Sequence, residues 1–199
     1  MTTPTHDPTP SGVPLLARGK HRDPADGSCL MEYVSVLSGR RFGDRPRCTH
    51  PLLGWLARRV NDQVGDAVRA RLTGVAPALV GTRVHGPHAR GVVRAVVYGE
   101  LATLGLVGAP RDPWLRDLHD RADEHLGHRV SGRRSLGATD RNRAFEAACE
   151  SVGDLDREDR DRLLAVALAR SVTRARRHLR LPAVGVVLID AERSVAVLH

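Results

Sequence analysis

Apolar side chains that recur every three or four positions are the feature that most constrains how this chain can fold. This spacing is the period of an amphipathic α-helix, which buries one stripe against a core. The longest such segment, residues 156–180, begins at Asp156, a good N-cap residue, and stops before Pro182. Its stripe consists of Leu164, Leu168, Val172 and Leu179. The sequence therefore predicts a fold built mainly from helices.

Further segments with the same period extend this prediction over most of the chain. They are residues 28–38, 51–72, 112–127 and 139–153. Residues 92–108 are ambiguous, because a helical stripe is combined there with β-branched runs and with glycines at 99, 105 and 108. We favour a helix for this segment.

The two ends of the chain differ from this pattern. Residues 1–18 are rich in Thr and Pro and poor in apolar side chains, which predicts a disordered tail. Residues 183–198 contain two short β-branched runs, which predict a β-hairpin. Because a lone hairpin is only marginally stable in water, this one must pack on the helices. We therefore expect one mainly α domain, residues 19–199, a helical bundle with a small C-terminal β-hairpin.

The net charge of +8 raises the question of a nucleic-acid partner. Lys20 is the single lysine among 31 basic residues, and the arginines are interleaved with Asp and Glu. This distribution is typical of a solvated, salt-bridged surface. One face of the helix predicted at 156–180 carries Arg170, Arg174 and Arg177, which could bind phosphates. We prefer to interpret them as a cationic helix end that complements the helix dipole.

No apolar run approaches the ~18 residues of a membrane span, and the first ten residues lack the basic and apolar segments of a signal peptide. We therefore expect a cytoplasmic protein that makes no contact with a membrane. In a reducing compartment, the three cysteines do not predict a structural disulfide.

Residues with metal-binding or catalytic potential gather between positions 21 and 50. Cys29 and Glu32 lie three residues apart at the start of the first predicted helix, so both project from one face. His21 precedes this helix, whereas Cys48 and His50 precede the second one. The connection between the helices could return Cys48 to the far end of the first helix or to its start.

If Cys48 returns to the start of the first helix, the cluster can bind a metal ion. His21, Cys29, Cys48 and His50 then supply two thiolates and two imidazoles, which is an ordinary ligand set for Zn²⁺. No C-x-x-C spacing supports this prediction. Of the functional interpretations, we favour a bound divalent metal, with zinc as the expected ion.

A second hypothesis makes Cys29 a catalytic nucleophile assisted by Glu32. The first turn of a helix offers free N–H groups and a dipole that favour a thiolate. The segment "DGSCL", Asp26–Leu30, resembles the D-G-x-C segment of ovarian-tumour-type cysteine proteases. That resemblance implies a histidine base on a downstream strand, but the predicted hairpin is followed only by His199. The pair His85 and His88 could approach the cluster, although nothing in the sequence requires it.

A third hypothesis treats Cys29 as a buried structural residue, since cysteine is among the most buried residue types. The protein could then act as a structural or interaction protein, or as a nucleic-acid binder through residues 156–180. The sequence identifies no partner.

A longer pattern covers the region from Gly19 to Asp62. It reads G-x-H, then G-x-C-x-M-E, then D-x-P-x-C-x-x-P, and ends in Asn61 and Asp62. The pattern resembles a family of small uncharacterised proteins from actinobacterial and actinophage genomes. The resemblance implies that this region defines the family, and it implies no activity. Asn61 and Asp62 could interrupt the second helix or act as hydrogen-bond partners of a ligand histidine.

Overall fold

The computed structural model describes residues 15–127, 136–137, 140–188 and 196–198. The main helices are α1 (Leu30–Leu37), α2 (Pro51–Gln63), α3 (Asp66–Arg71), α5 (Pro87–Gly108), α6 (Pro113–Leu126), α7 (Asp140–Ser151) and α8 (Arg157–His178). Shorter elements are the 3-10 helices η1 (Pro24–Asp26) and η2 (Leu72–Val75), helix α4 (Ala76–Leu79), and strands β1 (Val186–Leu188) and β2 (Ala196–Leu198). The predicted mainly α fold with a small C-terminal β element is confirmed.

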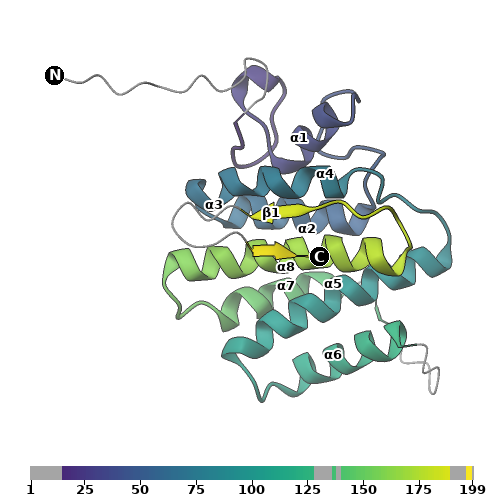
Figure 1. Cartoon of the computed structure of the whole chain (residues 1–199). Coiled ribbons are helices and arrows are strands. Elements are labelled where there is room, and N and C mark those ends of the chain that lie inside the picture. Colours follow the sequence, from purple (N-terminus) through teal and green to yellow (C-terminus); the bar gives the residue numbers. More distant parts are fainter. Residues whose placement is uncertain (1–14, 128–135, 138–139, 189–195, 199) are drawn as a thin grey trace.

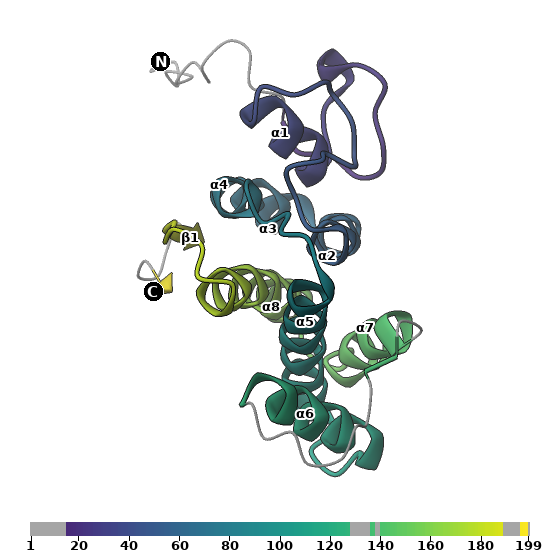
Figure 2. The same cartoon turned by 90° about the vertical axis from the view of Figure 1, so that its right-hand side faces the viewer.

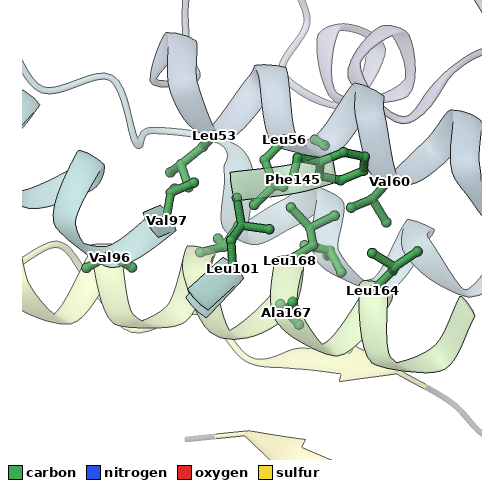
Figure 3. Packing of buried hydrophobic residues seen from close by; sticks show 14 of the residues in the cluster. Leu53, Leu56, Val60, Val96, Val97, Leu101, Phe145, Leu164, Ala167 and Leu168 are labelled. Atoms are coloured by element: carbon green, nitrogen blue, oxygen red, sulfur yellow. The ribbon is translucent and has the colours of Figure 1, made fainter. Parts of the chain in front are cut away.

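The helices are stacked in layers. Helix α1 lies at one end, followed by a layer of α2, α3 and α4, then by α5 and α8, with α6 at the opposite end (Figures 1 and 2). The core fills the space where α2, α5, α7 and α8 meet (Figure 3). Its side chains include Leu53, Leu56, Val60, Val97, Leu101, Phe145, Leu164 and Leu168. These residues come from the apolar stripes that predict the helices.

Helix α5 resolves the ambiguity of residues 92–108 in favour of a helix, and its glycines have a packing role. A Cβ atom at Gly99 would lie 3.3 Å from Ala122 Cβ, and one at Gly105 would lie 2.8 Å from Leu115 Cδ1. The missing side chains therefore let α6 approach α5 closely. By length and composition α5 could cross a membrane, but 67% of its most apolar window is buried, as in the central helix of a soluble protein.

Two predicted boundaries are wrong. The helix expected at 51–72 breaks between Gln63 and Asp66, because the Gly65 N–H donates to Asp161 Oδ2 on α8 over 2.7 Å. The helix expected to begin at 92 begins at Pro87, since proline suits the first turn, where no intrahelical partner for its nitrogen exists.

The N-terminal boundary of the fold also differs from the prediction. Leu16 forms a parallel bridge with Ser28. The Ala17 N–H donates to Ser28 O over 2.7 Å, and the Ser28 N–H donates to Leu15 O over 3.0 Å. Residues 15–18 are therefore part of the domain. The rest of the expected tail, residues 1–14, lies outside the described residues.

Strands β1 and β2 pair antiparallel, with Val186 opposite Leu198. The pair does not stand alone, because β1 lies directly against η2. A Cβ atom at Gly74 would lie 1.9 Å from Val187 O, so only glycine allows this approach of the two backbones. Residues 189–195 of the predicted hairpin lie outside the described part of the chain.

Candidate functional site

The buried carboxylate of Glu32 organises the start of α1. Its Oε1 accepts the His21 backbone N–H over 2.8 Å, and its Oε2 lies 2.9 Å from His21 Nδ1. Oε2 also accepts the Cys29 N–H over 2.8 Å, which completes a capping box with Cys29 at the N-cap. His21, Cys29 and Glu32 therefore do come together, as a structural connection between the N-terminal turn and α1.

The thiol of Cys29 does not have the properties of a nucleophile. Its side chain is only 2% exposed, and burial raises its pKa to about 12. The expected stabilisation of a thiolate by the helix N-terminus is therefore outweighed by desolvation. The His21 ring is hydrogen bonded to Glu32 rather than to the Cys29 sulfur. The geometry favours the buried structural interpretation of Cys29.

We expect Cys29 to resist alkylation in the native protein. A thiol with a pKa of about 12 and 2% exposure presents almost no accessible thiolate near neutral pH. Mass spectrometry after iodoacetamide treatment at pH 8 should find Cys29 unmodified without denaturant and fully modified in urea. Rapid native labelling of Cys29 alone would contradict this interpretation.

Cys48 lies at the other end of α1. Its Sγ is 3.4 Å from the Oγ of Ser38, which is the C-cap of this helix. At about 1.5 Å rise per residue, the length of α1 separates the two thiols by roughly 12 Å. Zinc ligands must lie within about 2.3 Å of one ion, so Cys48 does not return to the start of α1, as the zinc hypothesis requires, but to its far end.

The predicted zinc ligands are therefore divided among three places: His21 and Cys29 at the start of α1, Cys48 at its end, and His50 at the start of α2. Among the residues that the structure describes, no group of three or more His, Cys, Asp or Glu side chains could hold a metal ion. The zinc hypothesis thus receives no support from the arrangement of its four ligands.

Asn61 and Asp62 bind the N-terminal segment to α2. Asn61 Oδ1 accepts the Leu30 N–H over 3.1 Å, and its Nδ2 donates to Ala17 O over 2.9 Å. Asp62 Oδ1 accepts the Gly19 N–H over 2.9 Å. Both residues lie within α2, so they neither interrupt the helix nor support a ligand histidine. The sequence pattern from Gly19 to Asp62 is thus explained in large part by hydrogen bonds that hold this region together.

His50 has a different environment from the other predicted ligands. It is the N-cap of α2, where its Nδ1 accepts the Leu52 N–H over 3.2 Å. Its backbone N–H donates to Thr82 Oγ1 over 3.1 Å. Burial, followed by the charges of Arg83, Arg90 and Arg94, lowers its pKa to about 4. The imidazole is therefore neutral at pH 7, and because Nδ1 is an acceptor its proton sits on Nε2.

A cavity of about 430 Å³ opens beside His50. Among the described residues that line it, arginine is the most frequent and is contributed by three parts of the fold, and none is Asp or Glu. Arg83 comes from the segment before α5, Arg90 and Arg94 from α5, and Arg141 from α7. We call this cavity the arginine pocket.

The N-termini of three helices contribute to the lining of the arginine pocket. His50 begins α2, Gly86 is the N-cap of α5, and Arg141 is the second residue of α7. No side chain caps the N-terminus of α5, so its first N–H groups keep hydrogen-bonding capacity. Helix N-termini carry partial positive charge, which adds to the charge of the arginines.

Comparison of the chain with protein-family models, curated proteins and solved structures found no match. The resemblance to actinobacterial and actinophage proteins therefore stays a prediction.

Two arginines of the predicted basic face of α8 share one carboxylate. Arg170 Nε lies 3.0 Å from Glu100 Oε2, and Arg174 Nη1 lies 2.7 Å from Glu100 Oε1. Glu100 is buried in α5, so these two arginines are held by one internal carboxylate. This pairing does not favour the hypothesis that α8 binds nucleic acid.

Sequence reasoning identified His50 as a candidate but missed the arginines around it. Arg90, Arg94 and Tyr98 are spaced by four residues and so share one face of α5. This signal was hidden because the predicted helix began two residues after Arg90. The pair His85 and His88 marks the start of α5, and His85 lines the pocket.

The lowered pKa of His50 predicts a specific loss of stability in mild acid. Between pH 6.5 and pH 4 the unfolded chain binds a proton at His50 that the folded chain does not bind. Unfolding is therefore favoured as the pH falls through this window, by up to about 3 kcal/mol at its lower end. Urea unfolding of His50→Asn, which keeps an N-cap acceptor but cannot titrate, should show a correspondingly smaller loss. Equal pH dependence in both proteins would contradict the assignment.

Proposed function

We propose that the protein binds a small ligand through a phosphate-like anionic group in the arginine pocket. The observation that carries this proposal is that four arginines line one cavity whose described lining contains no carboxylate. Arginine presents several N–H donors in a planar arrangement that matches the oxygens of phosphate.

None of these arginines forms a direct ion pair within the described part of the chain, although the Asp140 carboxylate acts on Tyr98 together with Arg94 and Arg141. No ion pair joins Arg83, Arg90, Arg94 or Arg141 to an Asp or Glu there, whereas other arginines have such partners, as Arg174 has Glu100. Like charges gathered in a cleft repel one another and attract an anion. An anion in the pocket would relieve this repulsion.

The pocket also holds its donors in place before a ligand arrives. Arg94 Nη1 donates to Leu136 O over 2.7 Å, which leaves its other N–H groups available. The Arg141 guanidinium lies over the Trp55 ring, 5.5 Å from its centre. The cap bond to Leu52 orients the His50 ring and makes its Nε2 a donor. Such preorganisation lowers the entropic cost of binding.

Calorimetric titration with inorganic phosphate tests this proposal. We expect wild-type protein to bind phosphate and Arg94→Gln to bind it at least about tenfold more weakly, because charge-assisted hydrogen bonds are lost. Arg111→Gln is the matched control, since it removes the same charge from an exposed position between α5 and α6, beyond the far end of α5. The absence of wild-type binding, or equal weakening in both variants, would overturn the proposal.

A further inference from the structure

We propose that the ligand of the arginine pocket carries at least two linked phosphoryl groups, one bound at the floor and the next at the rim. This inference rests on the proposed function, because it specifies what the same pocket recognises. Its basis is the separation of the lining donors into a buried set and an exposed set.

The floor of the pocket is formed by buried or half-buried groups. His50 is 5% exposed and Tyr98 is 1% exposed, while Arg94 is half-buried. The Tyr98 hydroxyl donates to Gly137 O over 2.9 Å. This donor is already used within the protein, so the side chain closes the floor and does not bind the ligand. An anionic group bound between His50 and Arg94 would lie in an environment where water competes weakly for its oxygens.

The rim is formed by exposed arginines from three places in the sequence. They are Arg83, Arg90 and Arg141. Arg90 and Arg94 are one turn apart on α5, about 6 Å along the helix axis. A second phosphoryl group linked to the first would therefore extend from the floor toward Arg90, while Arg83 and Arg141 contribute charge from the sides.

Charge and volume favour more than one phosphoryl group. A single phosphate carries roughly −1.5 to −2 at neutral pH, which leaves part of the charge of four arginines uncompensated. The cavity of about 430 Å³ is also of the size that accommodates small organic ligands, commonly about 300–1,000 Å³. A diphosphate or a longer chain matches both properties better than a lone phosphate.

Calorimetric titrations with orthophosphate, pyrophosphate and tripolyphosphate at constant ionic strength test the inference. We expect pyrophosphate to bind wild-type protein at least about tenfold more tightly than orthophosphate, because it gains charge-assisted hydrogen bonds at the rim. Arg90→Gln should remove most of this preference, because it weakens pyrophosphate much more than orthophosphate. Arg94→Gln should weaken both anions, and Arg111→Gln should weaken neither.

The outcomes distinguish this inference from the proposal on which it rests. If orthophosphate and pyrophosphate bind equally and both depend on Arg94, the two-group inference is overturned and the anion pocket stands. If neither binds, both fail. A preference for pyrophosphate that survives Arg90→Gln would overturn the division into floor and rim. If a single-stranded oligonucleotide displaces bound pyrophosphate at a lower phosphate concentration than tripolyphosphate does, the pocket recognises a phosphodiester backbone and the inference is overturned.

Discussion

Glu32→Ala is expected to lower the free energy of unfolding by about 3–5 kcal/mol. The carboxylate is fully buried and accepts hydrogen bonds from the His21 backbone, the His21 ring and the Cys29 N–H. Alanine leaves these donors without an acceptor and leaves a cavity in place of the side chain. Urea unfolding followed by circular dichroism measures the effect.

Two further variants test whether the loss of stability comes from the hydrogen bonds of the Glu32 carboxylate. Glu32→Gln keeps one acceptor oxygen but cannot satisfy all three donors, so we expect an intermediate loss. Glu150→Ala removes an exposed carboxylate from α7 and should change the stability by less than about 0.5 kcal/mol. A Glu32→Ala protein as stable as Glu150→Ala would show that the connection between the N-terminal turn and α1 contributes little.

Arg176→Met is the second substitution with a large expected effect. Arg176 is buried in α8, where Nη1 donates to Ala78 O over 3.0 Å and to Val80 O over 2.9 Å. Nε and Nη2 both donate to Pro182 O, over 3.0 and 2.7 Å. Methionine preserves much of the volume but leaves three carbonyl groups unpaired, so we expect a loss of about 3–5 kcal/mol.

Arg177→Met provides the matched comparison, because it makes the same substitution at the next, exposed position of α8. We expect it to cost less than about 1 kcal/mol. Thermal unfolding of the two variants side by side measures the difference. Equal destabilisation would mean that Arg176 stabilises the fold through general charge effects rather than through its bonds to α4 and to the segment after α8.

The helical fold could be predicted because its signal is local. The stripe of Leu164, Leu168 and Val172 specifies a helix and its buried face without knowledge of any neighbour. Boundaries were less predictable where a distant residue decides them. The break at Gly65 depends on Asp161, which is 96 positions away in the sequence.

The candidate site was predictable only in part, because a site depends on which residues meet in space. The connection before Cys48 is compatible with both ends of α1, and the sequence does not decide between them. Glu32 and His21 meet because they lie only 11 positions apart. His50 lies beside arginines rather than beside the other predicted ligands, since Arg90 and Arg94 line the same cavity from α5 through tertiary packing that residue spacing does not encode.

The most direct test of the arginine pocket is the position of an anion in crystals of the wild-type protein soaked with tungstate. Tungstate has the shape and charge of phosphate and can be located by its anomalous scattering. We predict a tungsten peak inside the pocket, roughly 4 Å from His50 Nε2 and from the Arg94 guanidinium, so that oxygens of the anion lie within about 3.2 Å of both donors. Tungstate peaks confined to arginines outside the pocket, with none beside His50, would contradict the assignment of the pocket as an anion site.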